Sequence, residues 1–158
     1  MRVYLMRHGT AVDHFEWTGD DSTRPLTPRG VAGAARVIAE MQRRGAAPDV
    51  IIASPAARTE QTARIAAEAF DLPVVLVDRV AYGFSARTLP SVLDEADAAG
   101  ASEVLIVGHQ PTVGDVLEEV TGQRVHYKKG ACAAVDLTTI DPASGTMAWF
   151  VTHATAAE

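Results

Sequence analysis

The sequence predicts a three-layer αβα sandwich, with a mostly parallel central sheet and an antiparallel edge formed by the C-terminal part of the chain. Short apolar runs rich in β-branched residues alternate with longer segments of helical periodicity, which is the order of elements in α/β proteins. The C-terminal part instead holds two apolar runs around a turn-forming segment, a pattern typical of a hairpin. Because 158 residues suit one hydrophobic core, we expect residues 1–158 to form a single domain.

Four apolar runs are expected to form the parallel strands. They span residues 3–6, 50–53, 74–77 and 104–107. Each run is short and continuously apolar, as strands are when helices cover both faces of a sheet. We therefore expect all four strands to be buried.

The first predicted helix follows Thr27, which is a suitable N-cap. Pro28 stands at the first helical position, and Gly45 marks the end of the helix. The apolar stripe expected to face the sheet consists of Val31, Ala34, Ala35, Ile38 and Met41.

Three more helices are expected between and after the remaining runs. Ser54 and Pro55 should open the second in the same way as the first, the third should span about 88–100, and the fourth about 111–122. The inward-facing side chains are Ile65, Ala66 and Ala69 in the second helix, Leu89, Val92, Leu93 and Ala96 in the third, and Val113, Val116, Leu117 and Val120 in the fourth.

The C-terminal hairpin is expected to pair residues 132–138 with residues 147–152. Between them lies the segment 141–145, Asp-Pro-Ala-Ser-Gly, whose composition is typical of a turn.

Composition excludes several broad classes of protein. The net charge of −6 argues against general binding to nucleic acids or anionic membranes, which are polyanions. No apolar run approaches the roughly 20 residues that span a bilayer, and the N-terminal run is too short for a signal peptide, so we expect a cytoplasmic protein. Cys132 is the only cysteine; we expect a buried, inert thiol, with no disulfide and no cysteine-based zinc site.

Polar side chains follow three of the four predicted strands. Arg7 and His8 come directly after the first, Arg58 comes shortly after the second, and His109 comes after the fourth. Because the carboxyl ends of parallel strands meet at one edge of a sheet, these residues should gather at one site.

These residue types suit the transfer of a phosphoryl group. A neutral imidazole such as that of His8 is a good nucleophile toward phosphorus. Arginine forks can stabilise the equatorial oxygens of the transition state, and Arg58 is expected in the first turn of its helix, where anions are favoured. Gly9 should let the backbone approach the ligand closely.

Three motifs resemble those of the histidine phosphatase superfamily, in the order in which that family carries them. Residues 5–9 (Leu-Met-Arg-His-Gly) resemble its signature, while 54–62 and 107–111 resemble its second and third motifs. The short chain and residues 24–27 (Arg-Pro-Leu-Thr) are most similar to the SixA-type phosphohistidine phosphatases.

The resemblance implies a phosphoglycerate mutase-like fold and a role for each matching residue. It implies that His8 is the nucleophile, that Arg7 and Arg58 bind phosphate, that His109 completes the pocket, and that Arg24 is a further phosphate contact. No cofactor is implied, and we find no motif for a metal or a nucleotide.

The sequence departs from the family at the general acid. Many members carry a carboxylate after the third strand, but in residues 78–87 only Asp78 is acidic. We favour a turn or surface position for Asp78 over an acid role. An alkoxide leaving group has a conjugate acid of pKa about 15.7 and needs a proton donor, whereas imidazole, with a pKa of about 6.5, needs far less help. The missing acid therefore fits a phosphohistidine substrate.

The function we expect first is dephosphorylation of phosphohistidine on a protein, such as a phosphorelay domain. A small-molecule phosphomonoesterase is the alternative enzyme, and a mutase fits the short chain less well. A non-catalytic module that binds phosphate or phosphoproteins is the alternative of a different class. The sequence makes no prediction about oligomeric state.

Three further groups of residues have secondary interpretations. His14, Phe15 and Trp17 could form a lid or docking surface, although a partly exposed loop cluster is the favoured interpretation. Residues 126–129 are basic and could meet an acidic substrate, but a solvated turn is favoured. His153 is expected at the surface.

Overall fold

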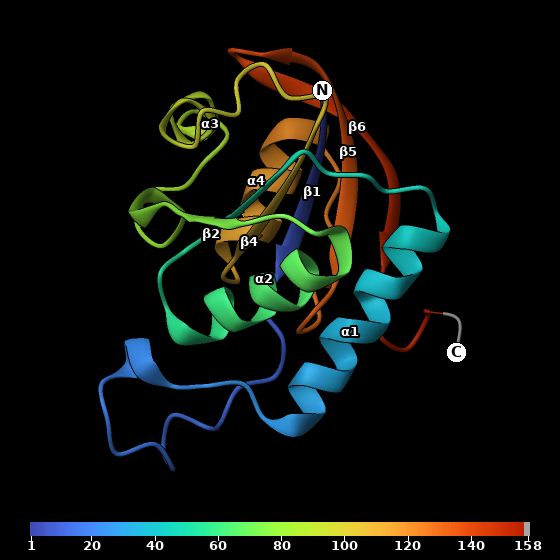
Figure 1. Cartoon of the computed structure of the whole chain (residues 1–158). Helices are drawn as coiled ribbons and strands as arrows, with labels where there is room; N and C mark the ends of the chain where they lie inside the picture. Colours follow the sequence, from blue (N-terminus) through green and yellow to red (C-terminus); the bar gives the residue numbers. More distant parts are fainter. Residues whose placement is uncertain (157–158) are drawn as a thin grey trace.

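The sheet joins all the strands of the described chain in one layer. The computed structural model describes residues 1–156, so the last two residues of the predicted 1–158 domain lie outside it. Its strands are β1 (Arg2–Arg7), β2 (Val50–Ala53), β3 (Val74–Leu76), β4 (Glu103–Gly108), β5 (Cys132–Ile140) and β6 (Ala143–Val151). They are ordered β3-β2-β4-β1-β5-β6. The first four strands pair in parallel, and β5 and β6 add an antiparallel edge beside β1, which confirms the predicted sheet (Figure 1).

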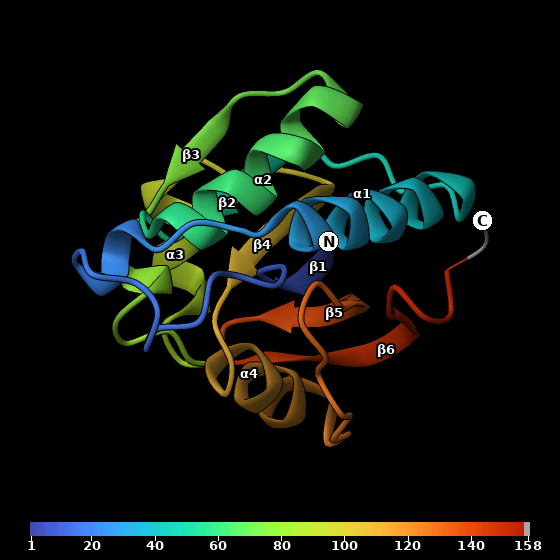
Figure 2. The same cartoon turned by 90° about the horizontal axis from the view of Figure 1, so that it is seen from below.

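Helices cover both faces of this sheet. On one face lie α1 (Pro28–Arg43) and α2 (Ala57–Phe70), and on the other lie α3 (Leu89–Glu95) and α4 (Thr112–Thr121) (Figure 2). Two short 3-10 turns, η1 (Asp21–Thr23) and η2 (Asp78–Val80), interrupt the connecting loops. The predicted three-layer αβα sandwich is confirmed. No helix within residues 1–156 is long and apolar enough to cross a membrane.

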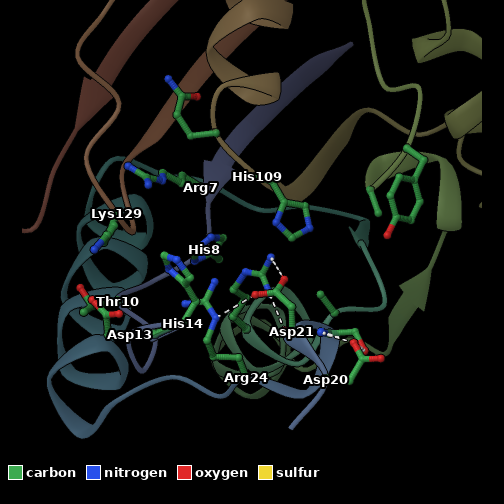
Figure 3. Close-up of a pocket in the computed structure, with 17 residues that line it drawn as sticks. Arg7, His8, Thr10, Asp13, His14, Asp20, Asp21, Arg24, His109 and Lys129 are labelled. Atoms are coloured by element: carbon green, nitrogen blue, oxygen red, sulfur yellow. Dashed lines mark hydrogen bonds and ion pairs between the residues drawn. The ribbon is translucent and has the colours of Figure 1, made fainter. Parts of the chain in front are cut away.

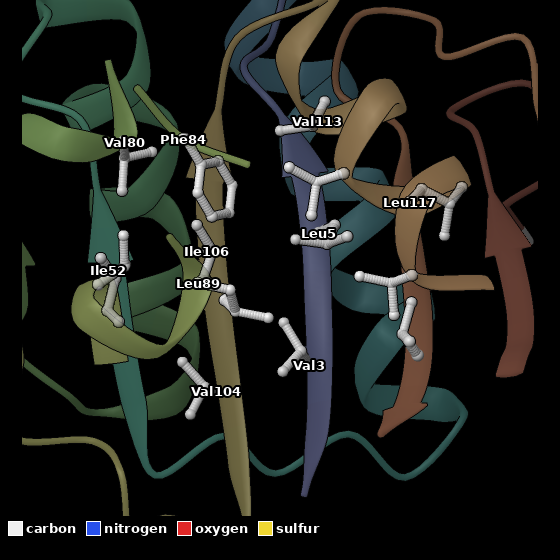
Figure 4. Close-up of a cluster of buried hydrophobic side chains, with 14 of the residues drawn as sticks. Val3, Leu5, Ile52, Val80, Phe84, Leu89, Val104, Ile106, Val113 and Leu117 are labelled. Atoms are coloured by element: carbon white, nitrogen blue, oxygen red, sulfur yellow. The ribbon is translucent and has the colours of Figure 1, made fainter. Parts of the chain in front are cut away.

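Alternation of side chains along the strands supplies two separate hydrophobic cores. On β1, Val3 and Leu5 pack toward α3 and α4 (Figure 4), whereas Tyr4 and Met6 pack toward α1 and α2. Each is at most 2% exposed. Because full burial of a large apolar side chain contributes roughly 1.5–3 kcal/mol, these cores hold β1 rigidly and so position the residues that follow it.

The predicted boundaries of α1 are confirmed, but its buried face is rotated. The Thr27 hydroxyl accepts the Gly30 N–H at 3.0 Å, and Gly45 has φ of 85° just after the helix. Val31 is 44% exposed and Ala35 is exposed, while Val37 is fully buried. The contact stripe starts at Gly30, because only a glycine allows α1 to pack against the backbone of Thr10. That close contact turns Val31 outward.

The second helix starts later than predicted. Ala56 is its N-cap residue and no side chain caps it. The hydroxyl of Ser54, two residues earlier, accepts the Ala56 N–H at 3.4 Å and also lies 2.7 Å from the His109 Nε2. The predicted inward position of Ala69 is wrong, since that residue is exposed, and Ile65 is half-buried.

The predicted end is wrong for the third helix and confirmed for the fourth. The third ends at Glu95, before the predicted residue 100, because Asp97 takes a left-handed conformation with φ of 53°. The fourth ends before Gly122 as predicted. The inward faces predicted for both helices are buried.

Two predictions about strands need correction. The strand β3 is not fully buried, since it lies at the edge of the sheet and Leu76 is 42% exposed. The hairpin turn is shorter than 141–145, because Ala143 already pairs with Ile140. Gly145 belongs to β6, where a Cβ would lie 2.2 Å from the Asp136 carbonyl oxygen, so its role is close pairing and not turning. Cys132 is fully buried, as predicted.

Candidate active site

Strand register places the ends of β1, β2 and β4, from which the predicted site residues follow, at the same level of the sheet. Arg7 on β1 pairs with Gly108 on β4, and Ala53 on β2 pairs with Val107. The next residue along β1, His8, donates its N–H to the Gly108 carbonyl at 3.0 Å. The chain therefore leaves the sheet at His8, Ser54 and His109 on one common edge.

The loop between β1 and α1 forms the outer wall of the site. It folds back on itself through a bridge between Ala11 and Leu26 and through the Thr27 N–H, which donates to the Thr10 carbonyl. This fold brings Asp21 and Arg24 over the edge of the sheet. The result is a pocket of about 780 Å³ whose lining includes Arg7, His8, Arg24, Arg58 and His109 (Figure 3). The structure thus brings five of the predicted site residues together.

His8 is buried in a way that keeps its ring neutral. It is 8% exposed, and its Nδ1 lies 2.7 Å from the Gly9 carbonyl oxygen. Burial lowers the pKa of His8 to about 3, helped by His109, Arg58 and Arg7 and opposed by the Gly9 carbonyl. Since a carbonyl only accepts, the neutral ring carries its proton on Nδ1. The Nε2 lone pair is therefore free, as a nucleophile requires.

His109 lies against His8 and is also held neutral. Their ring centroids are 5.5 Å apart at 65°, and the His109 Nε2 lies 2.7 Å from the Ser54 hydroxyl, which also contacts Thr59. Burial lowers the pKa of His109 to about 4, with Arg58 as the next cause. Ser54 therefore orients His109, a role that its sequence motif does not reveal.

Two arginines that line the pocket have a buried Nε atom without a partner in the described part of the chain. The Nε atoms of Arg7 and Arg58 are buried and have no hydrogen-bond partner within the described residues. The rest of Arg7 is anchored, because its Nη1 donates to the Tyr127 carbonyl at 2.8 Å. Leaving a buried donor unsatisfied costs about 1–3 kcal/mol, and more for a charged group. Both guanidinium groups belong to residues that line the pocket, so the pocket is suited to an anion such as phosphate.

Asp21 joins Arg24 and Arg58 at the mouth of the pocket. Its carboxylate lies 3.1 Å from the Arg24 Nε and 3.2 Å from the Arg58 Nη2. The Arg24 Nη1 also donates to the Val12 carbonyl at 2.7 Å. These bonds hold two cations near the His8 ring, with Arg24 as the main cause of the lowered pKa of Asp21. Sequence reasoning missed Asp21; the only local signal is its spacing of three residues before Arg24.

Gly9 is not among the residues that line this pocket, and the structure gives it a second role in packing. A Cβ at Gly9 would lie 2.8 Å from the Gly30 carbonyl oxygen, so the glycine allows α1 to pack against the site. Its N–H donates to the Thr62 hydroxyl at 3.0 Å. Gln61, which precedes Thr62 on α2, accepts the Leu26 N–H through its side chain at 2.8 Å. Several polar residues of the second motif thus hold the loops in place.

Asp78 lies outside the pocket. It is exposed at the start of η2, where it lines a separate hollow with Arg79 and Glu95. This placement agrees with the surface position favoured for it. The carboxylates that do line the pocket are Asp13, Asp20 and Asp21, all from the loop before α1.

The segment 126–129 is not simply a solvated turn. Tyr127 is 3% exposed and its hydroxyl donates to the Leu5 carbonyl, which ties the segment to β1. This bond positions the Tyr127 carbonyl for Arg7 and turns Lys129 toward the pocket. The predicted solvated turn is confirmed for His126, Lys128 and Lys129, which are exposed, but not for Tyr127, because the sequence does not show that Tyr127 packs into the core.

His14 and Phe15 form a partly exposed loop cluster, which is the interpretation that the sequence favoured. Their rings lie 4.0 Å apart, Phe15 is 87% exposed, and His14 lines the pocket. Trp17 is tied back to the loop, where its Nε1 donates to the Thr23 hydroxyl at 3.1 Å. Within residues 1–156, no three His, Cys, Asp or Glu side chains are grouped as a metal site would require.

Comparisons of the sequence with known proteins show which proteins this chain is similar to. The model of the histidine phosphatase superfamily (branch 1) matches residues 3–81. An uncharacterized protein of Picosynechococcus sp. is 33% identical over 135 residues, which cover 82% of this chain and 81% of that protein. The phosphohistidine phosphatase SixA of Escherichia coli is 26% identical over 152 residues, covering 94% and 92% of the two chains.

Solved structures share the fold over almost the whole chain. The structure of the protein histidine phosphatase SixA complexed with tungstate has a TM-score of 0.84 at 25% identity, and covers 98% of each chain. The α-ribazole phosphatase of Shigella flexneri has a TM-score of 0.71 at 17% identity, covering 100% of each chain, which shows a shared fold alone.

Proposed function

Because the chain belongs to the histidine phosphatase superfamily, we propose that it removes the phosphoryl group from phosphohistidine on a protein, through a covalent phosphoenzyme on His8. The observation that carries this proposal is the His8 ring itself. It is buried and neutral, its Nδ1–H is held by the Gly9 carbonyl, and it shares a pocket with three arginines. Similarity to SixA over most of the chain supports the substrate class.

In the first step, the His8 Nε2 lone pair attacks phosphorus. A bond forms between Nε2 and phosphorus as the bond from phosphorus to the substrate imidazole breaks. The other nitrogen of the substrate ring carries a proton, so the electron pair leaves with a neutral imidazole. The Nδ1–H of His8 stays bonded to the Gly9 carbonyl, which stabilises the positive charge that develops on the ring. Arg7 and Arg58, which line the pocket, stabilise the negative charge on the equatorial oxygens.

In the second step, water attacks the phosphoryl group on His8. The bond from Nε2 to phosphorus breaks, inorganic phosphate leaves with the oxygen of water, and His8 returns to its neutral form. His109 is held at its Nε2 by Ser54, so its other ring nitrogen is the one left to contact a phosphoryl oxygen or the water. The low pKa of His109 keeps this ring neutral at neutral pH, so it can accept a hydrogen bond from the attacking water.

The leaving group distinguishes the substrate classes. Asp78 is outside the pocket, and Asp21 is bound to two arginines that favour its ionised form, so neither is a good proton donor. Imidazole leaves with little help because its conjugate acid has a pKa of about 6.5. An alkyl ester needs a donor, so phosphohistidine is the better substrate for this pocket.

The test is a rapid-quench experiment with a chemically phosphorylated histidine peptide. We expect a phosphoenzyme that is stable in base and labile in acid, located on His8 by mass spectrometry. His8→Ala should lose both adduct and turnover, while His126→Ala, at an exposed position outside the pocket, should keep both. An adduct that forms equally well in His8→Ala would refute the mechanism.

The same experiment separates the alternatives. Turnover of an alkyl or sugar phosphate as efficient as that of the peptide would favour a phosphomonoesterase. Tight binding of phosphate with no adduct on any substrate would favour a non-catalytic module.

A further inference from the structure

A second hollow, of about 410 Å³, opens beside the active pocket. We call it the α1 hollow and define it by Gly9, Thr10, Arg29, Arg36, Lys129 and His153, which all line it. Arg29 and Arg36 come from α1, and Lys129 comes from the loop before β5. None of the roles derived above involves Arg29, Arg36 or His153.

Within residues 1–156, the lining of the α1 hollow is basic. Arg29, Arg36, Lys129 and His153 line it, and none of the acidic residues in that part of the chain does. Eight arginines of residues 1–156 form ion pairs with carboxylates, and neither Arg29 nor Arg36 is among them. This local excess of cations stands in a chain whose net charge is −6. A solvated helix face of an acidic protein has no folding need for such a cluster.

The floor of the α1 hollow is low because its central residues are small. Ala32 and Gly33 lie between Arg29 and Arg36 in its lining. A Cβ at Gly33 would lie only 3.8 Å from the Cβ of His153, so the helix and the C-terminal segment approach closely there. Seven residues of helix span about 10 Å. That length matches roughly three residues of extended chain at 3.3–3.6 Å each.

The α1 hollow adjoins the active pocket. Thr10 and Lys129 line both, and Gly9 follows His8 directly in the chain. Figure 3 shows Thr10 and Lys129 on the same side of the pocket. A peptide whose phosphorylated side chain reached His8 from this side would lay its neighbouring residues across the α1 hollow.

We propose that the α1 hollow binds an acidic segment of the protein substrate, next to the phosphorylated histidine. This inference rests on the proposed function and adds to it the kind of protein that is recognised. Carboxylates of the segment pair with Arg29 and Arg36, while Lys129 joins the two sites. Such exposed pairs contribute mainly to specificity and to the rate of association, and added salt screens them.

The test compares two phosphohistidine peptides of equal length, one flanked by two glutamates on each side and one by glutamines. At low salt the protein should favour the glutamate peptide about tenfold in kcat/KM, and 0.5 M salt should abolish most of that preference. The variant Arg29→Glu/Arg36→Glu should lose the preference or reverse it. Its turnover of p-nitrophenyl phosphate should stay at the wild-type level, because neither arginine lines the active pocket.

A matched variant controls for the change in total charge. Arg64→Glu/Arg124→Glu makes the same change at exposed arginines outside both sites, and it should keep the tenfold preference. Loss of the preference in both variants, or no preference in the wild type, would overturn the proposal.

Binding to His8→Ala separates this inference from the proposed function. With the nucleophile removed, the peptides remain phosphorylated, and calorimetry measures their affinities without any turnover. Tighter binding of the glutamate peptide that depends on Arg29 and Arg36 supports the α1 hollow even if no phosphohistidine is hydrolysed. Equal affinity for the two peptides overturns the inference. It is also overturned if Arg29 and Arg36 bind single-stranded RNA or a second copy of this chain while showing no preference between the peptides.

Discussion

The burial of His8 predicts a specific dependence of stability on pH. The pKa of His8 is about 3 in the folded protein and about 6.5 in an unfolded chain. Between these values the unfolded chain binds a proton that the folded protein rejects, so the free energy of unfolding falls as the pH falls from 6.5 toward 3. Above pH 6.5 both states are neutral and the effect disappears.

The size of the effect follows from the same two pKa values. At pH 5 the unfolded histidine lies about 1.5 pH units below its pKa, which corresponds to about 2 kcal/mol at about 1.36 kcal/mol per unit. His8→Asn replaces the titrating ring with a neutral amide. The loss of stability between pH 7 and pH 5 should therefore be about 2 kcal/mol smaller in the variant than in the wild type.

The measurement is urea unfolding at pH 7 and at pH 5 for both proteins. Comparing differences between the two pH values removes the direct cost of the substitution, and it cancels groups that titrate alike in both proteins. Val31→Asn, at an exposed position with no titratable side chain, should keep the wild-type difference. If His8→Asn lost as much stability as the wild type, His8 would not be held neutral by burial, and the reasoning for a neutral nucleophile would fail.

Four further predictions concern the site. Arg58→Ala should lower turnover at least about a hundredfold, since one transition-state donor contributes about 2.7–4 kcal/mol; an unfolded variant would instead make Arg58 structural. Ser54→Ala frees the His109 Nε2 and should lower kcat about tenfold with little change in KM, so an unchanged kcat would remove the orienting role. Asp78→Asn should leave turnover of the phosphohistidine peptide unchanged. Wild-type activity should survive EDTA, and tungstate should inhibit it. If EDTA abolished activity and one divalent metal restored it, the prediction that no metal is needed would be wrong.

Local chemistry explains why much of the fold was predictable. The cap formed by Thr27, the glycine after the fourth helix and the apolar runs of the parallel strands act over a few neighbouring residues. The gathering of His8, Arg58 and His109 followed from one general rule about the carboxyl ends of parallel strands. Such signals do not depend on which distant segments the chain meets.

Predictions failed where a distant contact decided the outcome. Val31 is exposed because Gly30 packs against Thr10, and Tyr127 is buried because its hydroxyl reaches the Leu5 carbonyl. Ser54 is not the N-cap residue of its helix, and its hydroxyl lies within hydrogen-bond distance of His109. In each case the local pattern allowed two arrangements.

The sequence by itself determined the layers, the edge of the sheet at which the site lies and the residue types that can transfer phosphate. Only the tertiary structure decided the state of those residues. Burial keeps His8 neutral, the loop before α1 brings Asp21 to Arg24 and Arg58, and Lys129 joins the pocket to the α1 hollow. The physical reason is that pKa values, ion pairs and hollows depend on distances between residues far apart in the chain, and only packing sets those distances.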